Sequence, residues 1–370
     1  MTIVTRQNML AEKTRFLISV GGIALSVFLI AFLLSLFQGW NLAVGRFVER
    51  VDADIWVARE GTSDFLNAAS ILPADVGEKL ASVPGVERLD PLIVRPMEVK
   101  VGDGERKEGL HLVGYEVNGG AGGPLKVDDG QETPGPGEVI VDSGFAKKAN
   151  VGIGDEIVVS NQPTKIVGIS SGGNLIFSQT AFVDIETARE LLAMDGLTTF
   201  YLLHLSSGAD PEQVRTAVEQ SDPAVDALSK ETFAKATRDR VMRQILPILA
   251  VILGLAFVVG VSITGLTIYN ATVEKSREFG ILKAIGFTNG YLFRLVLEQS
   301  LATGLLGFVI GAALTAIASR FVGDFVPQFV TLLRWQDVLF VLGTTIAMSV
   351  ISALLPVRRI ANVDPVSVFS

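Results

Sequence analysis

The chain has 370 residues, of which 49% are hydrophobic and 19% charged, and its formal net charge at pH 7 is −8. Soluble domains carry about 25% charged residues, so this composition favours a membrane protein over an ordinary soluble enzyme. The sequence contains no cysteine, which excludes disulfides and thiolate metal ligands within it.

Four long apolar stretches meet the requirement for a membrane helix, about 20 residues for a hydrocarbon core about 30 Å thick. The first stretch is longer than the apolar core of a cleaved signal peptide and has no A-x-A-like site after it, so we interpret it as a retained anchor. Continuous rather than alternating apolar residues favour helices over barrel strands. The predicted transmembrane helices are residues 16–40, 244–270, 294–319 and 337–357.

Basic residues near the helix ends predict the orientation of the chain. With four helices, both termini share one side with the loop between the second and third helices. The Lys and Arg residues of those short segments are Arg6, Lys13, Arg15, Lys275, Arg277, Lys283, Arg294, Arg358 and Arg359. We therefore predict a bacterial inner (plasma) membrane protein in which residues 1–15 and 358–370 are cytoplasmic.

The segment 41–240 is predicted to be a large extracytoplasmic domain. From Phe47 to Arg240 it holds 18 basic and 32 acidic residues, a net charge of −14. Alternating β-rich and helical runs predict an α+β domain of two lobes, so the fold class is an α-helical membrane protein with four transmembrane helices plus this domain.

Three patterns predict details of that domain. The runs "PLIVRPMEVKV" and "GLHLVGYEV" predict a hairpin, and "AFVDIETARELL" from Ala181 predicts a strand followed by a helix. Gly and Pro punctuate a Val- and Ile-rich stretch, which predicts a β-rich insert lobe at about 120–180. The Gly-rich "NGGAGGP" from Asn118 predicts a flexible joining loop.

The sequence contains one match to a catalytic motif, but the predicted elements around it do not fit that motif. The run from Gly168 to Gly172 matches the G-x-S-x-G nucleophile elbow around Ser170, but no helical pattern follows it, and the only histidines are His111 and His204. The sequence has no G-x-x-x-x-G-K-[ST] phosphate loop and no metal-ligand spacing. We predict a chain without a catalytic or metal site and without a cofactor of its own; a membrane-anchored hydrolase is a distant alternative.

The loop 274–290 between the second and third predicted helices mixes charged and large apolar side chains. The apolar residues recur at i, i+3 and i+6, which predicts a short amphipathic helix ended by a glycine. Such a helix needs a surface, and the pattern leaves open whether that surface is membrane lipid or a protein. The candidate contact residues are Glu274, Lys275, Arg277, Glu278, Phe279, Gly280, Ile281, Leu282, Lys283, Ile285 and Gly286.

Two further features belong to the third predicted helix. Gly307 and Gly311 form a G-x-x-x-G motif, which predicts close packing against another helix. Glu298 lies four residues after Arg294, and we expect an ion pair between them, with a polar substrate path as the alternative. The sequence assigns no substrate-binding residues.

The run "EKSREFGILKAIGFTNGYLFRLVLEQ" from Glu274 resembles the segment after the second membrane helix of MacB/FtsX-type ABC transporter permeases. The ending "LLPVRRIANVDPVSVFS" is similar to the C-terminus of that family, and "VPGVERLDP", "VGIGDEI" and "AFVDIETARELL" resemble its extracytoplasmic domain. The opening "AEKTRFLISVGGIALSVFLIAFLLSLFQGW" most resembles DevC- and HrtB-type members.

The resemblance implies a permease subunit that couples ATP hydrolysis by a separate ATPase to export or to mechanical work outside the membrane. The expected substrate is hydrophobic or amphipathic, such as haem, lipid, lipoprotein or peptide. The expected partners are two ATPase copies, which bring ATP and Mg²⁺, and a second permease copy in a homodimer or heterodimer. A periplasmic adaptor is left open, no nucleic acid is expected, and the alternative function is an FtsX-like, non-transporting regulator of a cell-wall hydrolase.

In this family interpretation the loop 274–290 is a coupling helix that docks on the ATPase. Its apolar residues divide between anchoring in the partner and packing on the membrane side, and its charged residues fix the orientation. Gly280 is expected to allow close backbone approach and Gly286 to end the helix.

Overall fold

The computed structural model describes residues 13–62, 64–65, 70–102, 106–172, 179–325 and 329–361. They divide into two compact units, which are considered separately below. The helical unit takes its residues from 1–39, 245–323 and 331–370, and the sheet unit takes its residues from 40–244 and 324–330.

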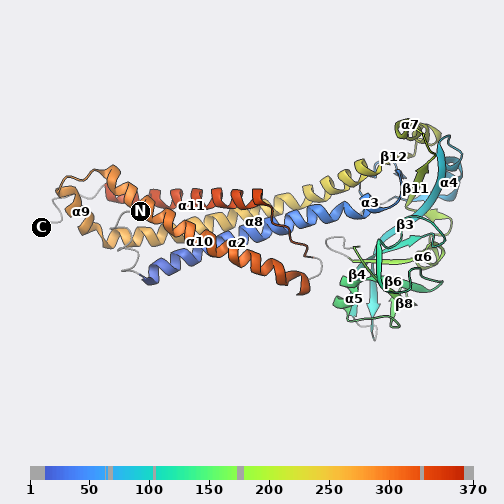
Figure 1. Ribbon diagram of the computed structural model, residues 1–370, viewed down its shortest axis with the longest axis horizontal. Helices are drawn as coiled ribbons and strands as arrows, with labels where there is room; N and C mark the ends of the chain where they lie inside the picture. The colour runs from blue at the N-terminus through green and yellow to red at the C-terminus, as the bar shows by residue number, and fades with distance from the viewer. Residues whose placement is uncertain are drawn as a thin grey trace. The chain divides into compact units, whose positions relative to one another are not determined.

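The described part of the helical unit has four long helices, which lie side by side, and one short helix at one end of them (Figure 1). Each long helix contains one of the four predicted apolar stretches and is long and apolar enough to cross a membrane. The first residues of α8 and the last residues of α2 belong to the sheet unit. The helices are α2 (Lys13–Val44), α8 (Lys230–Glu274), α9 (Ser276–Ala284), α10 (Asn289–Phe325) and α11 (Trp335–Ala361).

Small residues bring the helices of this unit close together. A Cβ atom at Gly311 of α10 would lie 2.6 Å from the carbonyl oxygen of Ala24 in α2, and one at Gly307 would lie 2.6 Å from Ile23. Two hydroxyl hydrogen bonds join other pairs of helices. Ser300 of α10 donates to the carbonyl oxygen of Ser349 in α11 at 2.7 Å, and Ser352 of α11 donates to that of Val261 in α8 at 3.1 Å. Because lipid is as apolar as the side chains, such close packing and hydrogen bonds hold membrane helices together.

The sheet unit is built on a mixed sheet in the order β12-β1-β11-β3-β4-β9-β6-β8-β5, with β7 pairing to β3 and β8. The pairs β4–β9 and β6–β8 are parallel, and the other pairs of this sheet are antiparallel. Its strands are β1 (Ile55–Arg59), β3 (Val86–Val101), β4 (Arg106–Tyr115), β5 (Lys126–Gly130), β6 (Glu138–Asp142), β7 (Glu156–Val159), β8 (Gln162–Ser171), β9 (Gln179–Asp184), β11 (Phe200–Leu205) and β12 (Val225–Ser229). A separate pair consists of β2 (Leu72–Pro73) and β10 (Leu197–Thr198).

The long strand β3 is shared by two hydrophobic cores. Its first half pairs with β11 and its second half with β4. Helices α4 (Ala74–Ala81) and α7 (Pro211–Ser221) contribute Leu80 and Val218 to one core, and α5 (Ser143–Ala149) and α6 (Ile185–Leu192) contribute Phe145 and Leu191 to the other. The antiparallel β3–β4 pair confirms the predicted hairpin, and α6 directly after β9 confirms the predicted strand followed by a helix.

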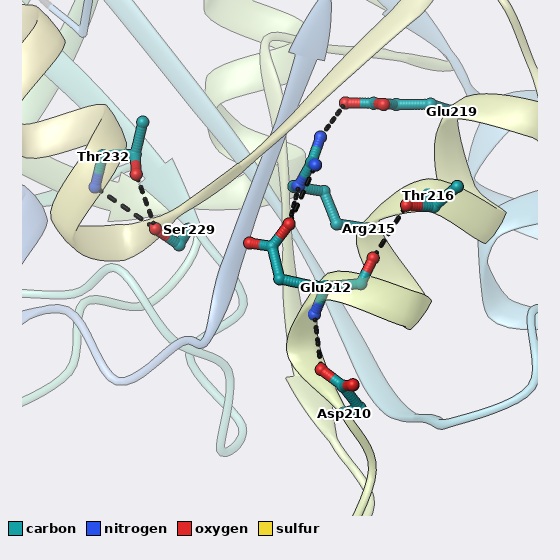
Figure 2. Close-up of polar contacts among 7 residues, drawn as sticks. All are labelled: Asp210, Glu212, Arg215, Thr216, Glu219, Ser229 and Thr232. Carbon is teal, nitrogen blue, oxygen red and sulfur yellow. Dashed lines mark hydrogen bonds and ion pairs between the residues drawn. The ribbon is translucent and has the colours of Figure 1, made fainter.

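Side-chain hydrogen bonds cap the first turns of two helices in the sheet unit (Figure 2). The Asp210 carboxylate accepts from the Glu212 backbone N–H at 3.0 Å at the start of α7, and the Ser229 hydroxyl accepts from the Thr232 N–H at 3.3 Å at the start of α8. On the surface of α7, Arg215 bridges Glu212 and Glu219, each at 2.9 Å. Side-chain acceptors of this kind satisfy backbone donors that the first helical turn leaves free.

The insert at about 120–180 contains strands β5, β6, β7 and β8, and two further details there were not predicted from the sequence. The structure has helix α5 within 120–180, started by the Asp142 carboxylate, which accepts from Gly144 N–H at 2.8 Å, and followed by left-handed Asn150. The Gly-rich loop is not a free linker, because Ala121 N–H donates to the buried Asp90 carboxylate at 2.9 Å and a Cβ atom at Gly123 would lie 2.6 Å from the Tyr115 ring. Its glycines allow close packing.

An aromatic core of five buried rings lies where α8 and α3 (Arg46–Arg50) meet the sheet. The ring centroid of Trp56 in β1 lies 5.3 Å from that of Phe233 in α8, 5.6 Å from that of Phe200 in β11 and 5.7 Å from that of Phe65. The ring centroids of Phe47 in α3 and Phe65 are 4.9 Å apart. Such rings dominate core energetics because each buries a large apolar area.

We expect Gly311→Leu to destabilise the chain by about 1–3 kcal/mol, because the added side chain meets a backbone carbonyl of α2 that cannot turn away. Thermal unfolding of the full chain in detergent measures the effect. Gly343→Leu in α11 is the matched control, since nothing lies within 4 Å of a Cβ atom there. Equal loss of stability in both variants would contradict the close packing of α10 on α2.

Candidate functional site

The candidate site is α9, the short helix between α8 and α10. It covers Ser276–Ala284, within the segment for which the sequence predicts an amphipathic helix. The helix ends at Gly286, whose φ of 103° is left-handed, with hydrogen bonds from Gly286 N–H to Lys283 O at 3.0 Å and from Phe287 N–H to Leu282 O at 3.1 Å. This pair of bonds is a Schellman motif, which glycine favours because it has no Cβ atom.

The inner face of α9 is anchored in the helical unit. Phe279 and Leu282 are partly buried against a cluster to which three of the long helices contribute, and Gly280 is buried as well. The cluster consists of Ile268 of α8, Leu292, Leu295 and Val296 of α10, and Ala353 of α11. A displacement of α9 therefore acts directly on α8, α10 and α11, because packed side chains transmit strain.

The outer face of α9 leaves apolar surface exposed. Ile281 is 41% exposed and Ile285, one turn later, is 71% exposed; together they form what we name the outer patch. Arg277 and Glu278 are exposed in the same helix, while Lys275 and Lys283 are half-buried. An apolar centre with charged surroundings is the composition of a protein interface.

The sequence analysis missed Phe287 as a member of the site. Its side chain is 41% exposed, and its ring lies 4.7 Å from that of Tyr291 at the start of α10. The position of Phe287 directly after the helix-ending glycine was the available signal. The predicted pair of Arg294 and Glu298 is confirmed at 3.1 Å, but the exposure of Arg294 makes it a weak contributor to stability.

The hydrolase alternative finds no support in the geometry. Ser170 lies within strand β8, is 1% exposed, and its hydroxyl donates to Val141 O at 3.4 Å. His204 lies on β11, which pairs with β1 and β3 and not with β8. Its Nε2 atom lies 2.9 Å from Asp90 Oδ2 and 2.8 Å from Arg88 Nη2.

His111 is no better placed to act on Ser170. It is buried on β4, which pairs with β3 and β9 and not with β8. Ser170 itself is buried within a strand and bonded to a backbone carbonyl, so it lacks the exposed strand-to-helix turn that a nucleophile elbow requires.

An open groove of about 620 Å³ lies beside the Gly-rich loop of the sheet unit, lined in part by Arg50, Tyr115 and Lys126. Burial raises the pKa of Tyr115 to about 12, and the charge of Asp184 adds to this. Burial also raises the pKa of Glu116, with the charge of Asp90 adding to the effect. Both shifts have desolvation as their main cause and do not identify a ligand.

Comparison with known families matches nearly the whole chain. The model of the MacB-like periplasmic core domain matches residues 16–221, more than half of the chain, and the model of the FtsX-like permease C-terminal matches residues 250–365. The second of these matches contains α9 and the outer patch.

Curated relatives agree with these matches. An uncharacterized ABC transporter permease of Mycobacterium tuberculosis is 23% identical over 362 residues, which cover 97% of this chain and 96% of that protein. Another from the same organism is 24% identical over 374 residues, which cover 100% and 99%. A "probable export ATP-binding/permease protein" of Pseudomonas fluorescens is 20% identical over 382 residues, which cover 97% of this chain and 58% of that protein.

Two solved structures resemble part of the chain. The periplasmic region of MacB from Actinobacillus actinomycetemcomitans is 12% identical with a TM-score of 0.38, and covers 50% of this chain and 92% of its own. The extracellular domain of the noncanonic ABC-type transporter YknZ from Gram-positive bacteria is 12% identical with a TM-score of 0.36, and covers 48% of this chain and 100% of its own.

We expect Leu282→Ala to lower stability by about 1–3 kcal/mol, because it removes packing between α9 and the three long helices. Ile281→Ala, at the neighbouring position on the exposed face, should leave stability unchanged within about 0.5 kcal/mol. Thermal unfolding of the full chain in detergent compares the two variants. If Ile281→Ala were the more damaging change, the assignment of inner and outer faces would be wrong.

Proposed function

Because the chain belongs to the MacB/FtsX family of ABC transporter permeases, we propose that it is the membrane subunit that couples ATP hydrolysis in a separate ATPase to work outside the membrane. That work is export of a hydrophobic or amphipathic substrate such as haem, lipid, lipoprotein or peptide, or mechanical action on the extracytoplasmic side. The observation that carries the proposal is the division of α9 into an anchored inner face and an exposed outer patch.

The outer patch favours a protein partner over a lipid surface. A helix that only rests on lipid turns its apolar side chains into the membrane and its charged side chains to water. Phe279 and Leu282 of α9 instead pack on the long helices, while Ile281 and the C-cap residue Ile285 are exposed. Fully burying an isoleucine contributes about 1.5–3 kcal/mol, so a pocket that accepts both would gain several kcal/mol before the costs of association.

The charged residues of α9 supply orientation rather than affinity. Arg277 and Glu278 are exposed beside the outer patch, where charges at an interface rim chiefly set association rate and register. The partner surface that fits is therefore an apolar pocket with a mixed-charge rim. We place this surface on the ATPase, which would bring ATP and Mg²⁺, since this chain contains no phosphate loop.

Membership of this permease family also implies the subunit composition and membrane orientation of the complex. Two permease copies, as a homodimer or heterodimer, would engage two ATPase copies, with α9 and both termini in the cytoplasm of a bacterium and the sheet unit outside the inner membrane. The relative from Pseudomonas fluorescens, described as an ATP-binding/permease protein, is consistent with a permease of this type working with an ATP-binding part. A periplasmic adaptor would extend the path beyond this membrane.

Two lobes are proposed for the extracytoplasmic domain, one for each core on either side of the shared strand β3. Sliding between them would be limited, because β3 is continuous through both. The alternative function, an FtsX-like regulator of a cell-wall hydrolase, differs in its output. Stimulation of ATPase activity by an apolar substrate favours export, whereas stimulation only by a hydrolase favours regulation.

Replacing both outer-patch residues, Ile281→Asp with Ile285→Asp, should release the ATPase while the chain stays in the membrane. Two buried negative charges would have to be desolvated in the partner's apolar pocket, so binding should fall by at least about tenfold. Co-purification of the ATPase from detergent-solubilised membranes, followed by quantitative immunoblotting, measures the change. Membrane fractions give the amount of inserted chain.

The matched control is Ile153→Asp, which makes the same change at an isoleucine that is exposed in the sheet unit. It should leave the ATPase bound. Substitutions at Phe279 and Leu282 are less informative, because these side chains pack inside the helical unit and their loss also perturbs the fold. An ATPase that remains bound to the doubly substituted chain would mean that α9 rests on lipid or serves only as a connector.

A further inference from the structure

The first four turns of α8 make a set of contacts that membrane crossing does not require. Within the sheet unit, Arg238 Nη2 lies 2.6 Å from Glu49 Oε1 of α3, and Arg240 Nε lies 3.1 Å from Asp64 Oδ2. Next to Arg238 in the chain, Thr237 accepts a hydrogen bond at its hydroxyl from the Phe65 N–H at 3.1 Å. We name these three contacts the α8 clamp.

Two residues of the clamp are buried, which makes their contacts costly to break. The Asp64 side chain is 6% exposed, and Thr237 is fully buried. A buried carboxylate is costly unless a cation or hydrogen-bond donors compensate it, so separation of Asp64 from Arg240 is disfavoured. One turn earlier, Phe233 enters the aromatic core beside Trp56, which fixes the same helix from its apolar side.

The absence of a side chain at Gly45 leaves space for the Arg238–Glu49 contact of the clamp. Its φ of −85° and ψ of −14° suit any residue, so the backbone does not require glycine there. A Cβ atom at Gly45 would instead lie 2.6 Å from Arg238 Nη2 and 3.2 Å from Glu49 Oε1. The missing side chain therefore provides the space in which the guanidinium reaches its carboxylate.

We propose that Arg238 and Arg240 are positioning residues that bind the start of α8 to α3 and to the sheet, so that movement of α8 carries the sheet unit as one body. This inference rests on the proposed function, in which ATP-driven movement enters at α9. Helix α8 is continuous from Lys230 to Glu274, with Pro247 in its interior, and only Lys275 separates it from α9. Without the clamp, α8 would turn or slide along α3 and the movement would be lost.

A purely stabilising role predicts a different pattern of effects. The Arg238–Glu49 pair is partly exposed, and exposed pairs contribute little to stability. The change Gly45→Ala should cost little stability, because the atom that the new methyl group meets is the end of the flexible Arg238 side chain. A coupling role instead predicts that Gly45→Ala and Glu49→Gln share one defect, since both separate the guanidinium from its partner.

The test uses the full chain with the ATPase that co-purifies with it, reconstituted in phospholipid vesicles. Because the sequence has no cysteine, Glu78→Cys on the exposed side of α4 introduces a single attachment site for a fluorophore. The ATPase rate reports the cytoplasmic side, and the ATP-dependent fluorescence change reports the sheet unit. Unfolding temperature in detergent is measured for every variant.

Gly45→Ala and Glu49→Gln should each keep the ATPase rate and the unfolding temperature but reduce the fluorescence response by at least about twofold. The charge swap, Glu49→Arg with Arg238→Glu, should restore part of the response. The matched control, Glu212→Gln, removes a partner of Arg215 in a surface pair on α7 and should change nothing (Figure 2).

A wild-type fluorescence response in both Gly45→Ala and Glu49→Gln would overturn the proposal. So would a parallel fall in unfolding temperature and response that the charge swap does not repair, because that pattern belongs to a structural role. Failure of the proposed function looks different: the unsubstituted chain would then bind no ATPase, or ATP would leave its fluorescence unchanged.

Discussion

The aromatic core is the interaction on which the organisation of the sheet unit depends. Phe233 from α8 and Phe47 from α3 meet Trp56, Phe65 and Phe200 in one buried cluster, so helices that are distant in sequence are bound to the same sheet. Such a cluster has low tolerance for displacement, because interiors are packed at crystal-like density. The polar contacts of the α8 clamp adjoin this core at Phe65 and join α8 to α3 and to the sheet at defined atoms.

A different constraint governs the helical unit. In lipid the apolar side chains gain nothing by leaving water, so association depends on close approach and on hydrogen bonds between helices. Gly307 and Gly311 let α10 approach α2, and Ser300 and Ser352 join α11 to its neighbours. The cluster that receives α9 is part of this assembly. The short helix is therefore held by three long helices on one side and remains open on the other.

These two constraints give one helix, α8, a well-defined attachment near each end. One is the aromatic core with the clamp, and the other is the cluster under α9, to which α8 contributes Ile268. A continuous helix of 45 residues, in which Pro247 leaves out one backbone hydrogen bond, suits the transmission of a displacement better than a chain of loops. The chemistry of ATP hydrolysis belongs to a partner in this scheme, and the chain contributes geometry.

The sequence by itself determined the four apolar helices, the hairpin of β3 and β4, and the position and end of α9, because each depends on local composition, periodicity and glycine placement. It could not determine that Leu282 faces inward while Ile281 is exposed, since neighbouring apolar residues of one helix look alike until the surrounding helices are in place. It also did not predict α5, whose short run lacks apolar periodicity, or the hydrogen bond that joins Ala121 of the Gly-rich loop to Asp90. Only the tertiary structure brought Glu49 within reach of Arg238, because 189 residues separate them in the chain and the fold alone makes them neighbours.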